Sequence, residues 1–227
     1  MNVGRRIAAF WQALSPAERA VLIAVLVLRL VGIGWGLPAS DGWDVDGIAP
    51  RDFLPGVVQT FTPGDHFTYP PLHLLLLTIL TLPVTLVKLA TVGSFAPATL
   101  VPAFLDPRVM TAFALVARLV NVAMSCVLLV TIGDLAALVF GRRARVWAMA
   151  VAGVEAAMTY YAHATNLDVP ALCWAALALL RTMRAIDADD PEQLGRAGLY
   201  AAFAIATKDQ SYALFALTMP IALGAWL

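Results

Sequence analysis

The run RVMTAFALVARLVNVAMSCVLLVTIGDLAALVF, residues 108–140, decides the fold class of this chain. After its first position, the only charged residues in it are Arg118 and Asp134. Because about 20 mostly apolar residues are enough to cross a bilayer, we expect one tilted membrane helix over Arg108 to Phe140. The whole chain has the same character, with 61% hydrophobic and 13% charged residues among its 227 and a mean hydropathy of +0.80. Soluble domains run nearer about 45–50% and about 25%, so an ordinary soluble domain and a basic nucleic-acid binder are both excluded.

Further apolar segments on both sides of this run predict an all-α, polytopic transmembrane bundle. We expect about six membrane helices, of which the last before Lys208 covers only half a bilayer. Besides Arg108 to Phe140, the segments are Ala17 to Leu37, Val146 to Ala164, Val169 to Ile186, GLYAAFAIAT at 198–207 and Ser211 to Leu227. The sequence stops inside an apolar segment, so residues 1–227 read as the N-terminal transmembrane module of a longer protein whose C-terminal remainder is missing.

Charge placement predicts the orientation of these helices. Arg5, Arg6 and Arg19 flank the first segment, and the loop GRRAR at 141–145 is strongly basic. Because basic loops stay in the cytoplasm, we expect a cytoplasmic N-terminus and a cytoplasmic 141–145 loop in a bacterial plasma membrane. The first outer loop, 38–107, then lies on the extracytoplasmic face, as do Asp168 and Lys208.

The segment Pro70 to Ala90 is apolar enough to cross, but the orientation argues against it. An odd number of crossings must separate the acidic part of the first outer loop from the basic 141–145 loop, and Arg108 to Phe140 supplies one. We therefore expect Pro70 to Ala90 to lie along the outer interface, which its Pro83 and Lys88 also favour. If it does cross, one more crossing must be hidden before residue 141.

Three short motifs on the predicted outer face carry the candidate site. In DGWDVDG, Asp44 and Asp46 form a carboxylate pair that can accept a proton from an attacking hydroxyl. The pair can instead bind Mg²⁺ or Mn²⁺, and the metal ligands we expect are Asp46 and Asp168. The alternative is a solvated acidic loop. The tract TYPPL holds Tyr69 at a helix start, where tyrosine is also a common interfacial anchor.

The other two motifs are YYAHATNLDVP at 160–170 and ATKDQ at 206–210. His163 is a possible ligand, proton carrier or plain interfacial residue, and Asp168 suits the first turn of a helix even without a ligand. Lys208 can hold a lipid phosphate at a helix break, or simply extend its amine to the interface. Together, the carboxylates and this amine predict a site for a phosphorylated lipid.

Three charged residues lie deep in apolar runs: Arg29, Arg118 and Glu155. A charge at mid-membrane costs about 2.5–3.5 kcal/mol on insertion scales, so each needs a partner. We expect Glu155 to pair with Arg29 or Arg118 as a structural contact.

The order of these parts resembles the C-type (GT-C) glycosyltransferases of family 39, the group of the protein O-mannosyltransferases and the bacterial lipid A aminoarabinose transferase. The shared features are one helix after a cytoplasmic N-terminus, an acidic outer loop, an aromatic-Pro-Pro-Leu tract (Tyr69 to Leu72), an outer Asp-x-Pro (Asp168, Pro170) and a Thr-Lys after a short helix (Thr207, Lys208). The resemblance covers nearly the whole chain, and the single motifs are short.

This resemblance implies an enzyme that passes a sugar from a polyprenyl-phosphate donor to a glycan, lipid or protein acceptor outside the cytoplasm. By resemblance, Asp44 or Asp46 is the general base, with Asp41 also possible, and Asp168 places metal or acceptor. Lys208 meets the donor phosphate and Tyr69 lines the donor cavity. The alternatives are a polytopic transporter, for which no internal repeat is apparent, and a catalytically inactive scaffold of the same fold.

Overall fold

The computed structural model describes residues 3–38 and 47–226, and the regular secondary structure in these ranges is helical. The only strand-like feature among them is one antiparallel bridge between Gly47 and Asn166. Two short 3₁₀ turns, η1 (Pro50–Asp52) and η2 (Asp209–Ser211), join longer elements. The α-helices are α1 (Val3–Ala13), α2 (Pro16–Leu30), α3 (Phe53–Thr60), α4 (Pro71–Thr91), α5 (Pro97–Phe104), α6 (Pro107–Phe140), α7 (Arg142–Val154), α8 (Ala156–Ala162), α9 (Asp168–Ala188), α10 (Pro191–Thr207) and α11 (Tyr212–Trp226).

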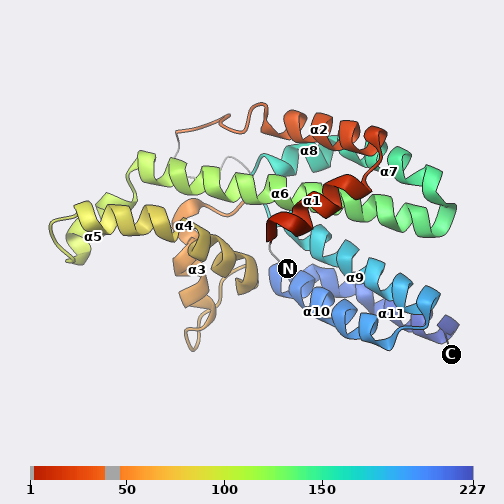
Figure 1. Cartoon of the computed structure of the whole chain (residues 1–227). Helices are drawn as coiled ribbons and strands as arrows, with labels where there is room; N and C mark the ends of the chain where they lie inside the picture. Colours follow the sequence, from red (N-terminus) through yellow and green to blue (C-terminus); the bar gives the residue numbers. More distant parts are fainter. Residues whose placement is uncertain (1–2, 39–46, 227) are drawn as a thin grey trace.

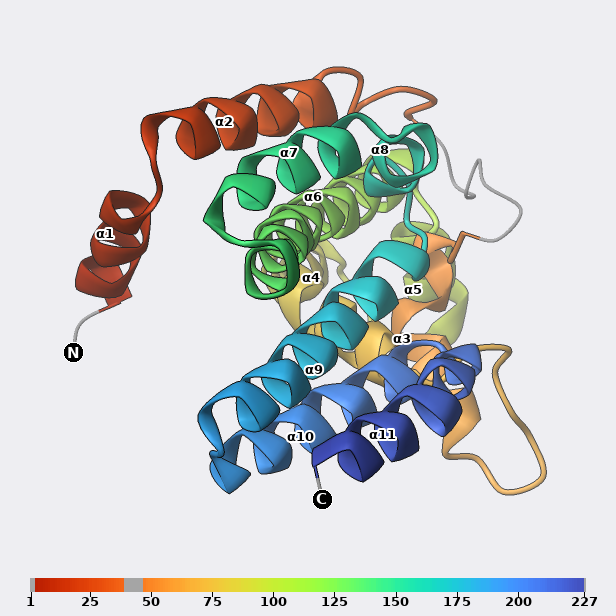
Figure 2. The same ribbon diagram turned by 90° about the vertical axis from the view of Figure 1, so that its right-hand side faces the viewer.

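Helix α6 is the long central helix of the described chain, and the other helices lie around it (Figure 1). Helices α2, α7 and α8 cover one side, and α9, α10 and α11 cover the opposite side. Helices α3, α4 and α5 gather around its N-terminal part. Figure 2 shows α6 between α7 and α9, with α1 standing apart at the edge. The all-helical class that the sequence predicts is therefore present.

Three described helices are long and apolar enough to cross a membrane: α4, α6 and α9. The sequence predicted about six crossings, and the difference lies mainly in shorter helices. Helix α2 ends at Leu30 instead of Leu37, because Gly32 and Gly36 adopt positive φ angles of 80° and 76° and turn the chain. Helix α4 qualifies as a span by length and composition, so its interfacial placement stays a prediction.

The continuous helix predicted over Val146 to Ala164 is wrong, because the chain breaks at Glu155 into α7 and α8, and the crossing predicted for this segment stays a prediction. Glu155 has an extended backbone (φ −60°, ψ 129°), and its carboxylate accepts hydrogen bonds from the amides of Ala157 (3.1 Å) and Met158 (2.7 Å). An acceptor side chain at this position satisfies amides that have no partner in the first helical turn. Glu155 thus starts a new helix.

The predicted pairing of Glu155 with Arg29 or Arg118 is also wrong, because each residue has other surroundings. Glu155 is exposed at the start of α8. Arg118 donates through Nη1 to the carbonyls of Ile33 (2.6 Å) and Trp35 (2.8 Å), in the turns that follow α2. Arg29 is fully buried beside Cys126, and none of its side-chain nitrogens donates to an acceptor in the described ranges.

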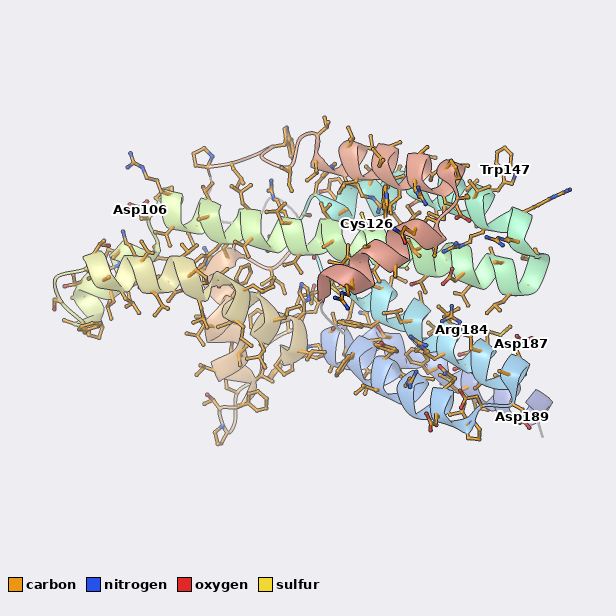
Figure 3. The ribbon with its side chains drawn as sticks, viewed as in Figure 1. Asp106, Cys126, Trp147, Arg184, Asp187 and Asp189 are labelled. Atoms are coloured by element: carbon orange, nitrogen blue, oxygen red, sulfur yellow. The ribbon has the colours of Figure 1, made fainter. Side chains whose placement is uncertain are left out.

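Near the C-terminal end of α6, beside the basic 141–145 loop, lies an ion-pair network that the sequence did not predict. Arg145 contacts Glu18 at 3.3 Å and Asp134 at 2.9 Å, and Asp134 also contacts Arg184 at 3.1 Å. These four residues come from α7, α2, α6 and α9, so the network joins four helices. Figure 3 shows Arg184, with Asp187 and Asp189, at the opposite end of the molecule from Asp106.

Candidate functional site

The loop between α8 and α9 positions Asp168, the first residue of α9. The Asn166 side chain accepts a hydrogen bond from the Asp168 amide at 2.6 Å, which closes the start of the helix. Asn121 of α6 is buried and donates from Nδ2 to the carbonyls of Ala164 (2.7 Å) and Asn166 (2.8 Å). The backbone that carries Asp168 is therefore held firmly against α6.

The first outer loop reaches the same place. The Ile48 amide donates to the Thr165 carbonyl at 3.0 Å, and Thr165 Oγ1 donates to the Ile48 carbonyl at 2.7 Å. With the bridge between Gly47 and Asn166, these bonds form a two-residue pairing between segments that lie far apart in sequence. Ile48 and Leu167 are both buried in one core cluster. Residues 47 and 48, directly after the DGWDVD motif, are therefore held beside the segment that carries Asp168.

Lys208 and Asp168 form a direct ion pair, with Nζ 2.5 Å from Oδ1. Their side chains are 18% and 30% exposed. Helix α10 ends at Thr207, and Lys208 has an extended backbone (φ −145°, ψ 111°) before η2. The helix break predicted at Lys208 is present, and the break directs the amine to the start of α9.

Tyr69 packs at the edge of the core cluster that contains Ile48 and Leu167. Its ring lies 6.5 Å from that of Phe67, at an interplanar angle of 59°. Tyr69 precedes α4, which begins at Pro71 as the TYPPL tract predicts. The cluster therefore joins the segment carrying Tyr69 to the residue before Asp168.

His163 ends α8, and its Nε2 is buried without a hydrogen-bond partner in the described ranges. The histidine belongs to the same loop as Asp168, five positions earlier in the chain. Its exposure is intermediate.

The predicted bases, Asp44 and Asp46, lie outside the described residues, as does Asp41. The predicted metal site can be tested only on its other ligand, Asp168, whose Oδ1 is bonded to Lys208. In ranges 3–38 and 47–226, no group of three histidine, cysteine or acidic residues is arranged to hold a metal ion. Among the described residues, one carboxylate that is already bonded to a lysine does not fit Mg²⁺ or Mn²⁺, since Mg²⁺ takes near-octahedral oxygen coordination.

The sequence pointed to the charged residues of this site but not to the polar residues whose hydrogen bonds hold the Asp168 segment in position. Asn121, Thr165 and Asn166 are 1%, 8% and 1% exposed and supply the hydrogen bonds described above. For Asn121 a signal exists in the sequence, since an amide side chain inside an apolar run needs a partner. Thr165 and Asn166 give no comparable signal, because short polar residues are ordinary in loops.

No protein-family model, curated protein or solved structure matches this chain.

Proposed function

We propose that the protein is a membrane glycosyltransferase that moves a sugar from a polyprenyl-phosphate donor to an acceptor hydroxyl on the extracytoplasmic face. The observation that carries this proposal is the meeting of three segments at the start of α9. They are residues 47 and 48, directly after the motif that holds Asp44 and Asp46, the carboxylate of Asp168 and the amine of Lys208. The resemblance to C-type glycosyltransferases supports the same assignment.

The proposed reaction is a displacement at the anomeric carbon of the sugar. The acceptor oxygen forms the new bond to this carbon while the bond from the carbon to the donor phosphate oxygen breaks. The acceptor proton passes to a first-loop carboxylate, Asp44 or Asp46, and the phosphate leaves on its polyprenyl chain with the bonding electron pair. A positioned base of this kind contributes about 10²–10⁴-fold to the rate.

In this proposal Lys208 binds the donor phosphate and Asp168 orients the amine. The leaving phosphate gains negative charge, so a nearby ammonium group stabilises the transition state more than the ground state. An ammonium already held by a carboxylate needs little reorganisation when the donor arrives. Lys208 at the end of α10 supplies that group.

The test is turnover of polyprenyl-phosphate-linked sugar by the full-length protein in membranes, followed as release of free polyprenyl phosphate. Asp44→Asn, Asp46→Asn and the double variant are compared with Asp65→Asn, an exposed acid of the same loop. We expect the variant at the true base to lose about 10²–10⁴-fold of the rate and the Asp65 variant to keep it. Full activity in both single variants and in the double variant refutes the proposal.

A further inference from the structure

A cavity of about 410 Å³ lies between η1, α3, α4, α5 and the first turns of α6. Its walls include Phe53 from α3, Val101 from α5 and Phe113 from α6. The volume falls in the range of about 300–1,000 Å³ that is usual for ligand pockets. Neither the predicted site nor the proposed reaction uses this cavity.

The cavity lining is apolar, although three threonines of α4 contribute to it. The hydroxyls of Thr78, Thr81 and Thr85 donate to backbone carbonyls four residues earlier, at 2.8, 2.8 and 3.1 Å. Their hydrogen-bonding needs are met inside the helix, so they offer no unused donor to a polar ligand. Apolar cavities of this kind stay dry and take apolar molecules.

One side of the cavity reaches the surface, and that surface is itself apolar. Leu54 and Val101 line the cavity and are 54% and 56% exposed. Phe61, directly after α3, and Phe95, before α5, are each more than two-thirds exposed. Helix α4, which forms one wall, is also one of the three helices apolar enough to cross a membrane. Exposed apolar surface of this kind is typical of membrane-contact sites. With α4 as one wall, it favours lipid chains at the opening of the cavity.

The residues that line the cavity include one cationic side chain. Arg51 of η1 lines the cavity, its side chain is 49% exposed, and its Nε lies 3.9 Å from the Asp52 carboxylate. Guanidinium groups bind phosphate through paired hydrogen bonds. An apolar cavity with an arginine in its lining matches a lipid that has a hydrocarbon chain and a phosphate.

We infer that this cavity binds one acyl chain of a bilayer phospholipid whose phosphate is held by Arg51. A phospholipid fits better than the proposed donor because a layer of buried side chains separates the cavity from Asp168. Phe53, Met110 and Phe113 form the cavity wall, and they belong to the same core cluster as Leu167. A donor with its phosphate at Lys208 would have to pass its chain through this packed layer. The inference therefore does not depend on the proposed function.

The experiment measures lipid retention by the full chain, purified in mild detergent and examined by native mass spectrometry with added phosphatidylglycerol. Val101→Trp fills the open side of the cavity. Leu86→Trp is the matched control, since Leu86 is 60% exposed on α4 and does not line the cavity. Arg51→Gln removes the cation, and undecaprenyl phosphate is the competitor.

We expect the wild-type chain and the Leu86 variant to retain one phosphatidylglycerol. The Val101 variant should bind it about tenfold more weakly, which corresponds to 1.4 kcal/mol. The Arg51 variant should bind phosphatidylglycerol about threefold more weakly, because a half-exposed charge contact contributes little free energy. Equal retention by the Val101 and Leu86 variants overturns the inference, and so does displacement of phosphatidylglycerol by a lower concentration of undecaprenyl phosphate. Turnover is not measured, so the outcome is separate from that of the proposed reaction.

Discussion

The ion pair of Lys208 and Asp168 is the contact at the residue scale on which the proposed site depends. Both side chains are mostly shielded from solvent, at 18% and 30% exposed. Removing one partner leaves the other charge partly shielded from solvent and without this contact, whereas removing both does not. The pair therefore contributes to stability as a unit.

We predict that Lys208→Met and Asp168→Asn each destabilise the protein, and that the double variant is more stable than the sum of the two effects implies. Contacting residues of this kind show coupling of about 1–2 kcal/mol. The measurement is a double-mutant cycle of thermal unfolding in detergent. Strict additivity of the two effects would show that the contact contributes nothing.

Glu155 supports a second prediction at this scale. Because its carboxylate caps α8, Glu155→Ala should lower the melting temperature, and Glu155→Asp should retain most of it. Combining Glu155→Arg with Arg29→Glu should restore nothing. Recovery of expression or melting temperature in this charge-swapped variant would support the ion pair that the sequence first suggested.

At the scale of elements, close packing of helices requires glycine at certain positions. A Cβ atom added at Gly153 of α7 would lie 2.4 Å from Val25 Cγ2 of α2. A real side chain cannot remain that close, so α2 and α7 would have to separate. Gly133 of α6 is similar, since its added Cβ would lie 2.8 Å from Met149 Cγ.

We predict that Gly153→Ala destabilises the protein by about 1–3 kcal/mol through overpacking. The matched control is Gly198→Ala in α10, where an added Cβ meets nothing within 4 Å and alanine favours the helix. Thermal unfolding should separate the two variants clearly. Similar melting temperatures would mean that α2 and α7 are not in close contact.

At the scale of the whole molecule, the two ends of α9 carry different sets of ion pairs. Asp168 and Lys208 lie at the start of α9, and the network of Glu18, Asp134, Arg145 and Arg184 lies toward its other end. From Asp168 to Arg184 the helix rises about 24 Å, close to the thickness of a bilayer core. That these two ends lie in different compartments stays a prediction.

Arg145 connects α7 to α2 and α6, so we predict that Arg145→Ala lowers stability by about 3 kcal/mol. Its side chain is 15% exposed and that of Glu18 only 5%, so the substitution leaves a buried carboxylate without its cation. Arg143→Ala, at an exposed position of the same basic loop, is the control and should change stability by less than about 0.5 kcal/mol. If the two variants unfold alike, the network has no structural role.

Cysteine accessibility tests the orientation. In a background with Cys126 and Cys173 replaced by alanine, Arg143→Cys and Gln210→Cys each place a thiol at an exposed position. We expect an impermeant maleimide to label position 210 from outside the cell and position 143 only after permeabilisation. Labelling of both positions from the same side contradicts the orientation and, with it, the proposed function.

Local signals in the sequence predicted the helix boundaries that lie near proline or a polar residue. Helix α4 begins at Pro71, α9 begins at Asp168 and α10 ends before Lys208, as expected. Each boundary depends on residues within one helical turn, which a sequence shows directly. The break at Glu155 was missed because its surroundings, VEAAM, look like the interior of a helix.

By itself, the sequence determined that this is an all-helical chain with membrane-type segments, because apolar composition and run length act without regard to tertiary contacts. Only the tertiary structure decided which distant residues meet. Thr165 and Ile48 are 117 positions apart, and Arg118 reaches carbonyls 83 and 85 positions away. Such partners depend on how helices pack in space, since a buried polar group binds whichever acceptor the packing brings within reach.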